Sequence, residues 1–181
     1  MSDRPWYRQP DLFIALAALV VSISAVAVGL YEAALQRAHD RAEVWPHLEV
    51  GTFLAERGAT VVLTNSGLGP AIVKSIAVTI DGKPVKDWAA ALQTLLGAPA
   101  ANFVVTTVFD TAVRPGDHVQ ILGLGQAQMP SPFWKSIGRV AVTICYASVF
   151  DQFWAIDARL GGRNVWRAVD HCPPQRADDD L

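Results

Sequence analysis

ATVVLTNSGLGPAIVKSIAVTIDG, residues 59–82, contains two predicted β-strands joined by a turn rich in glycine. The first strand, Ala59–Thr64, is rich in β-branched residues and ends at an Asn-Ser-Gly turn cluster. In the second, Ala71–Ile80, one face is apolar apart from Lys74, as expected of a half-buried strand. Asp81-Gly82 then forms a strong hairpin signal. The stretch therefore predicts antiparallel β-structure.

The chain on the C-terminal side continues this pattern with short apolar runs between Gly, Pro and Asp turns. One short helix is predicted at Ala89–Leu96, ended by Gly97. Further strands are predicted over residues 102–109, 118–124, 139–146, 150–158 and 164–169. Several short strands with one minor helix favour an antiparallel, Ig-like β-sandwich over residues 47–172, and a small β-barrel is the alternative. The acidic tail, residues 173–181, is expected to be disordered.

The N-terminal side is different, because Leu12–Tyr31 reads LFIALAALVVSISAVAVGLY and contains no charge. About twenty such residues suffice for a helix to cross a bilayer. The sequence thus predicts a tail (1–11), a transmembrane helix (12–31) and a helical stalk (32–46). A buried core helix is one alternative. A signal peptide cleaved after Ala27, at the Ala25-Val26-Ala27 site, is the other, and it would release a secreted domain.

Two motifs carry a resemblance to a known group of proteins. Trp45-Pro46-His47-Leu48 follows the apolar helix, and Asn65–Ala71 reads NSGLGPA. These segments resemble the W-P-x-L and N-x-G-x-G-P-A pattern of a scattered group of uncharacterised bacterial single-pass membrane proteins with an Ig-like β-sandwich domain. The resemblance spans roughly residues 12–82. It implies a sandwich anchored in a bacterial inner membrane and carries over no catalytic residue.

The side of the membrane is not decided by basic residues, because Arg4 and Arg8 before the helix balance Arg37 and Arg41 after it. A short N-terminal tail before an uncleaved apolar segment favours a cytoplasmic N-terminus and a periplasmic domain, and a cytoplasmic domain is the alternative. The two cysteines, Cys145 and Cys172, are compatible with one disulfide in an oxidising compartment or with two separate buried thiols.

Charge and composition limit the classes of partner. Charged residues make up 18% of the 181 residues, below the usual share of about 25%, and the net charge is −2. No basic cluster points to nucleic acid. Gly67-Leu68-Gly69 and Gly123-Leu124-Gly125 lack the third glycine of a dinucleotide loop, so we predict turn glycines rather than a ligand loop. In the first of the two, Asn65, Gly67 and Gly69 are predicted to give positive φ or a capped turn.

No catalytic or metal motif stands out. Ser66 is not in a G-x-S-x-G context, and His39, His47, His118 and His171 lack the spacing of metal ligands. We therefore expect no cofactor, no metal and no enzyme activity, with a hydrolase on the same scaffold as the alternative. The sequence favours a membrane-anchored binding or scaffolding module whose partners are the lipid bilayer and an unknown protein. Phe133-Trp134, in a Pro-rich loop, is the predicted point of partner contact.

Overall fold

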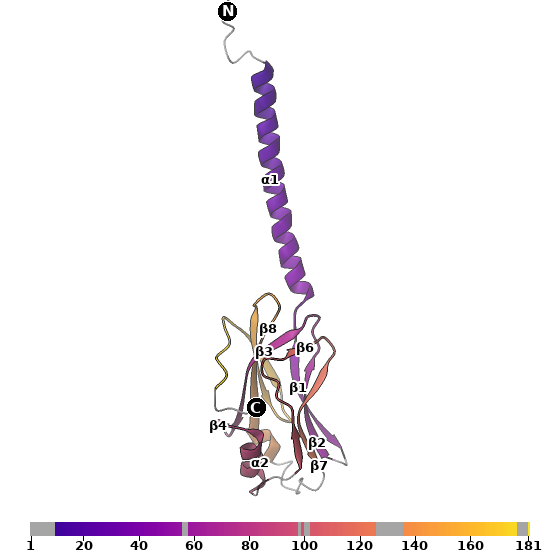
Figure 1. The fold of residues 1–181 in the computed structure, drawn as a ribbon, viewed down its shortest axis with the longest axis vertical. Coiled ribbons are helices and arrows are strands. Elements are labelled where there is room, and N and C mark those ends of the chain that lie inside the picture. The colour runs from indigo at the N-terminus through magenta and orange to yellow at the C-terminus, as the bar shows by residue number, and fades with distance from the viewer. Residues whose placement is uncertain (1–9, 56–57, 98, 100–101, 126–135, 177–180) are drawn as a thin grey trace, which may run out of the picture. The chain divides into compact units, whose positions relative to one another are not determined.

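The computed structural model describes residues 10–55, 58–97, 99, 102–125, 136–176 and 181. The chain divides into two compact units, Met1–Ala42 and Glu43–Leu181. The first contains almost all of one long helix, and the second, called the β domain below, contains the strands and a second, short helix (Figure 1).

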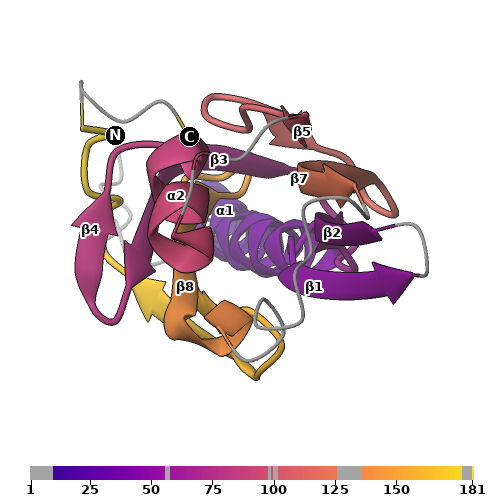
Figure 2. The same ribbon diagram turned by 90° about the horizontal axis from the view of Figure 1, so that it is seen from below.

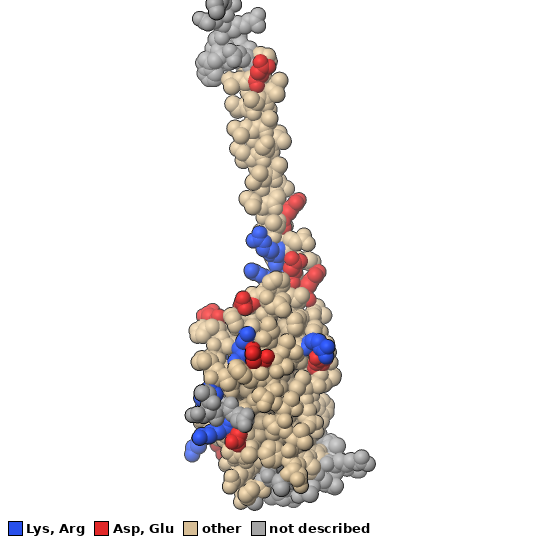
Figure 3. All heavy atoms as spheres, viewed as in Figure 1, with Lys and Arg blue, Asp and Glu red and all other residues tan. Residues whose placement is uncertain are grey.

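Helix α1 runs without a break over Pro10–Glu43, 34 residues. Pro10 occupies its first position, where the missing N–H costs no hydrogen bond. The hydroxyls of Ser22 and Ser24 donate to the carbonyl oxygens of Ala18 and Val20, each at 2.8 Å, so neither side chain needs a partner outside the helix. The segment is long and apolar enough to cross a membrane, with a mean hydropathy of 2.6, and none of its apolar window is buried. Figure 3 shows a length of α1 without charged atoms.

One sheet of the β domain contains four antiparallel strands in the order β1-β2-β7-β5. Their bounds are β1 Leu48–Ala55, β2 Gly58–Asn65, β7 His118–Gly125 and β5 Phe103–Val105. The strand predicted at Ala59–Thr64 is β2, and every second residue of it is buried, as in a strand with one face on a core.

The second sheet is also antiparallel and has the order β10-β9-β8-β3-β4, with β6 pairing beside the start of β3. The bounds are β3 Ala71–Ile80, β4 Lys83–Val85, β6 Ala112–Val113, β8 Val140–Ala147, β9 Phe153–Arg159 and β10 Asn164–Val169. The predicted Asp81-Gly82 hairpin joins β3 to β4, and both residues have positive φ, 51° and 78°.

Both sheets contribute to one core. Val61 and Leu122 from the first sheet and Ile76 and Ile144 from the second belong to the same buried cluster. Helix α2, Trp88–Leu96, adds the buried Trp88, and its ends are fixed by Asp87, which accepts from the Ala90 amide, and by Gly97. Figure 2 shows β1, β2 and β7 side by side, with α2 between them and β4. The prediction of a mainly β, antiparallel fold with one minor helix is confirmed.

The C-terminal segment is attached to the outer side of the second sheet. Cys172 forms a disulfide with Cys145 of β8, with 5.6 Å between the Cα atoms, so these two cysteines are not separate thiols. The Gln175 side chain accepts a hydrogen bond of 2.8 Å from the Ile76 amide, and Leu181 is buried. The sequence predicts that the tail, residues 173–181, is disordered. Within this tail, Gln175 and Leu181 pack against the domain.

Several predicted bounds are wrong. Helix α1 ends at Glu43, before the end of the predicted helical stalk at residue 46, because the Trp45 carbonyl is engaged by a loop of the β domain. Strand β9 begins at Phe153 rather than at 150, because Asp151 has a φ of 54° in the preceding turn. Strand β5 covers only residues 103–105 of the predicted 102–109. Strand β1 was not delimited from the sequence.

Candidate functional site

Backbone hydrogen bonds hold residues 45–47, at the start of the β domain, against the turn that follows β2. We call this set of contacts the loop clasp. The Leu68 and Gly69 amides donate to the Trp45 carbonyl at 2.9 and 3.3 Å, and the Ser66 amide donates to the His47 carbonyl at 2.9 Å. A Cβ added at Gly69 would collide with the Val44 carbonyl. This turn therefore needs glycine because two backbone segments approach closely, and not because of a positive φ. Of the two alternatives predicted for this turn, the capped turn holds and the positive φ does not.

Asn65 is the centre of this clasp and is fully buried. Its Nδ2 group donates to the carbonyls of Gly69 and Val113 at 2.8 and 2.9 Å. Its Oδ1 accepts from the amides of His47 and Gly67 at 3.2 and 3.0 Å. One side chain thus satisfies four backbone groups from three separate segments, which fixes their positions relative to one another.

Three neighbouring loops meet the first residues of β3. The turn residues 66–70 lead directly into β3, and the Asp110 amide donates to the Val73 carbonyl at 3.0 Å. The β8–β9 turn, residues 148–152, follows Ala147, which pairs with Ile72. The loops therefore lie at the same end of the β domain as residues 44–47, where the chain enters it.

Apolar side chains at this end are exposed. Leu68 is 73% exposed, Val149 51%, Phe150 42%, Phe109 43% and Trp45 43%. We call these five residues the tip surface. Large apolar side chains exposed together at one end of a domain are typical of interaction sites, so the tip surface is the candidate site.

The tips are rigidly supported. The buried Ser148 hydroxyl accepts from the amides of Phe150 and Gln152 at 3.2 and 3.3 Å, and the Ser148 amide donates to the Gln152 carbonyl at 2.9 Å. The sequence Val-Phe-Asp occurs in both the 106–111 loop and the β8–β9 turn, and in each the Asp, 110 or 151, has a φ of 54°. Each turn thereby exposes a phenylalanine beside a carboxylate. This repeated tripeptide is the signal that sequence reasoning missed.

Aromatic rings continue from the tip surface along the β domain. The ring centroids of Trp45 and His47 are 4.9 Å apart, and those of His47 and Trp166 are 4.6 Å apart. The Trp166 indole donates to the Leu48 carbonyl at 2.7 Å, and the Asn164 amide group donates to the Val50 carbonyl at 3.2 Å. These two contacts connect β10 to the edge of β1, so they hold the two sheets together on this side of the β domain.

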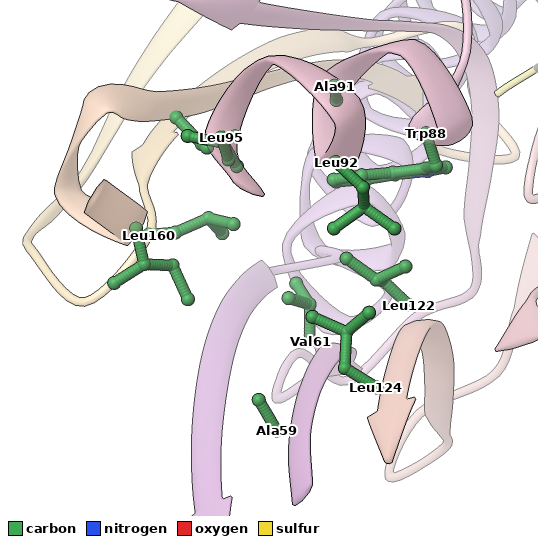
Figure 4. Close-up of a pocket in the computed structure, with 11 residues that line it drawn as sticks. Ala59, Val61, Trp88, Ala91, Leu92, Leu95, Leu122, Leu124 and Leu160 are labelled. Atoms are coloured by element: carbon green, nitrogen blue, oxygen red, sulfur yellow. The ribbon is translucent and has the colours of Figure 1, made fainter. Parts of the chain in front are cut away.

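The apolar cavity beneath α2 is a packing defect rather than a ligand site. It has a volume of about 10 Å³, and Figure 4 shows the side chains that surround it, among them Trp88, Leu92, Leu122 and Leu160. A single water needs at least about this space together with polar partners, and the lining is apolar.

The side chains whose pKa is shifted take part in structural contacts. The guanidinium of Arg139 donates to Asp81 and lowers the pKa of that carboxyl, and Arg114 lowers the pKa of Asp117 in the same way. Burial raises the pKa of Tyr146. Within the described part of the chain, no three His, Cys, Asp or Glu side chains gather as a metal site requires. The predicted contact pair, Phe133 and Trp134, lies outside the described residues.

Comparison with protein-family models, with curated proteins and with solved structures finds no match to this chain.

Proposed function

We propose that this chain is a membrane-anchored binding module of a bacterium, related to the group with the W-P-x-L and N-x-G-x-G-P-A pattern. Residues 12–31 of α1 span the inner membrane, and the β domain is an Ig-like sandwich that docks a protein partner through the tip surface. The observation that carries the proposal is the set of exposed apolar tips held by the rigid Asn65 and Ser148 networks.

The sandwich assignment is supported by the shared core of the two antiparallel sheets and by the Trp166 and Asn164 bridges between their edges. The anchor is supported by the length and hydropathy of α1 and by the absence of burial in its apolar window.

The periplasmic side is supported by the Cys145–Cys172 disulfide, because disulfides persist mainly in oxidising compartments. A reporter joined to the C-terminus by a flexible linker tests the side. Active alkaline phosphatase and a dark green fluorescent protein are expected, and the reverse pattern would place the domain in the cytoplasm. The mass of the mature N-terminus separates the anchored form from one cleaved after Ala27.

The chemistry of the tips suggests the kind of protein that fits them. Phe109 and Phe150 offer apolar area, and the adjacent Asp110 and Asp151 are exposed carboxylates. A complementary surface has an apolar centre and a basic rim. The exposed carboxylates beside the apolar side chains repel an anionic lipid surface, which favours a protein as the occupant.

Photo-crosslinking in the source cells tests the docking surface. A photoreactive phenylalanine analogue is placed at Phe150, and the matched control is Phe53 on β1, which is 62% exposed. We expect a discrete protein adduct from position 150 and none from position 53. The adduct should disappear when Phe109→Ala and Leu68→Ala are added. Equal labelling at both positions, or adducts with lipid alone, would contradict the proposal.

A further inference from the structure

A second surface lies at the other end of the β domain and is built from arginines. Asn164 and Ala158 are the cross-strand pair next to the turn of the β9–β10 hairpin. Arg159, the last residue of β9, and Arg163, just before β10, flank this turn. Both side chains are exposed. Among the described residues, the ion pairs involve other arginines and neither of these two.

Arg159 and Arg163 line the same depression, and like charges brought close together repel each other. The turn between them is closed by a 2.8 Å hydrogen bond from the Gly162 amide to the Arg159 carbonyl. An anion held between the two guanidinium groups would remove the repulsion and convert it into attraction.

The surface between these side chains is hollowed. A depression of about 390 Å³ is lined by Ala141, Asp157, Ala158, Arg159, Arg163 and Val165. Ala141 pairs with Arg159 across the β8–β9 ladder, and its small side chain leaves room above the sheet. The volume falls in the range of small-molecule sites, about 300–1,000 Å³.

The negative charge of Asp157, the single carboxylate that lines the depression, is already compensated by Arg167. Asp157 accepts a hydrogen bond of 2.7 Å from the Thr143 hydroxyl and lies 3.4 Å from a guanidinium nitrogen of Arg167. Arg159, Arg163 and Arg167 against Asp157 therefore leave an excess of two positive charges around the depression.

We infer that the hollow between Arg159 and Arg163 binds a phosphoryl dianion, the free phosphate group of a monoester. Its charge of about −1.5 to −2 at neutral pH matches the excess charge of the site. Its three terminal oxygens can accept the paired N–H groups of planar guanidiniums. A monocarboxylate leaves one positive charge uncompensated. The phosphate belongs to a soluble ester or to a lipid headgroup, which share this chemistry.

The test uses the full chain in nanodiscs of phosphatidylcholine, with inorganic phosphate and glycerol 3-phosphate titrated at constant ionic strength. The test variant is the double substitution Arg159→Gln with Arg163→Gln. The matched control is Lys83→Gln with Lys86→Gln, which removes two exposed positive charges at the same end of the domain.

We expect the wild type to bind with a dissociation constant of about 0.1–1 mM and the arginine variant to bind at least about tenfold more weakly. The dissociation constant of the lysine variant should stay within about twofold of the wild-type value, because this variant changes only the general electrostatic field of the domain. Phosphate should also raise the melting temperature of the wild type and leave that of the arginine variant unchanged.

Equal weakening in both variants would show a general charge effect and overturn the site, as would the absence of binding by the wild type at about 10 mM phosphate. Vesicles containing phosphatidate identify the source of the phosphate. Capture of these vesicles through Arg159 and Arg163 assigns it to lipid, and binding of the soluble ester without capture assigns it to a soluble compound.

Discussion

At the scale of single residues, Asn65 connects three segments of the β domain through its side chain. It is the first residue of the NSGLGPA turn, and its amide satisfies groups from the turn, from β6 and from the segment that enters the β domain. An alanine at this position would leave several buried backbone groups without partners, and each of these costs about 1–3 kcal/mol.

We therefore expect Asn65→Ala to lower the free energy of unfolding by about 3 kcal/mol, measured by chemical denaturation in detergent. Asn65→Asp should be more destabilising at neutral pH, because its carboxylate would face the carbonyl oxygens of Gly69 and Val113. An alanine variant with wild-type stability would show that the turn is held by its other contacts.

Acid should destabilise the fold through two exposed ion pairs. Hydrogen bonds from Arg139 and Arg114 lower the pKa values of Asp81 and Asp117 below those of the unfolded chain. Their contribution to stability is therefore complete above the unfolded pKa and is lost as the pH falls through the lowered one. We expect the melting temperature to drop below about pH 4. The double variant Asp81→Asn with Asp117→Asn should show a weaker dependence, and an unchanged slope would contradict this assignment.

At the scale of elements, the C-terminal segment is fastened to the second sheet by its disulfide and by Gln175. The cysteines are 27 residues apart, and closing a loop of that length stabilises a fold by about 3.5 kcal/mol in the chain-entropy account.

Replacing Cys145→Ala with Cys172→Ala should cost about this amount and should match the effect of reducing the wild type with a thiol. Both are read from denaturation curves. A reduced wild type that unfolds at the same denaturant concentration as the oxidised protein would mean that Gln175 and Leu181 hold the segment by themselves.

Elements were predicted well where a local pattern specifies them. The alternation in Ala71–Ile80 predicted β3, and Gly97 correctly ended α2. Strand β1 was not delimited because LEVGTFLA contains a glycine and lacks clear alternation. Phe109 and Phe150 were assigned to strands because their exposure depends on the positive-φ turns at Asp110 and Asp151. The position of Arg159 and Arg163 at one depression depends on the folded β9–β10 hairpin, which spacing alone does not provide.

At the scale of the whole molecule, the chain combines a helix that lacks a buried face with a β domain that has its own core. A helix of this hydropathy does not stay in water without a partner or a membrane.

We expect the full-length chain to sediment with membranes, to stay in the pellet after alkaline carbonate and to be released by detergent. A soluble full-length chain with an intact N-terminus would contradict the anchor. Val21→Arg, at the middle of the apolar segment, should reduce insertion, since a central arginine costs about 2.5–3.5 kcal/mol on insertion scales. Ser22→Ala should leave it unchanged.

The disulfide also has a consequence for how the protein matures. The chain contains two cysteines, so only one intramolecular pairing exists. Oxidation at any moment during folding cannot scramble the bond within one molecule, and no isomerase is needed to correct it. A simple thiol oxidant acting on the newly made chain is sufficient to form the disulfide that attaches the C-terminal segment to the second sheet.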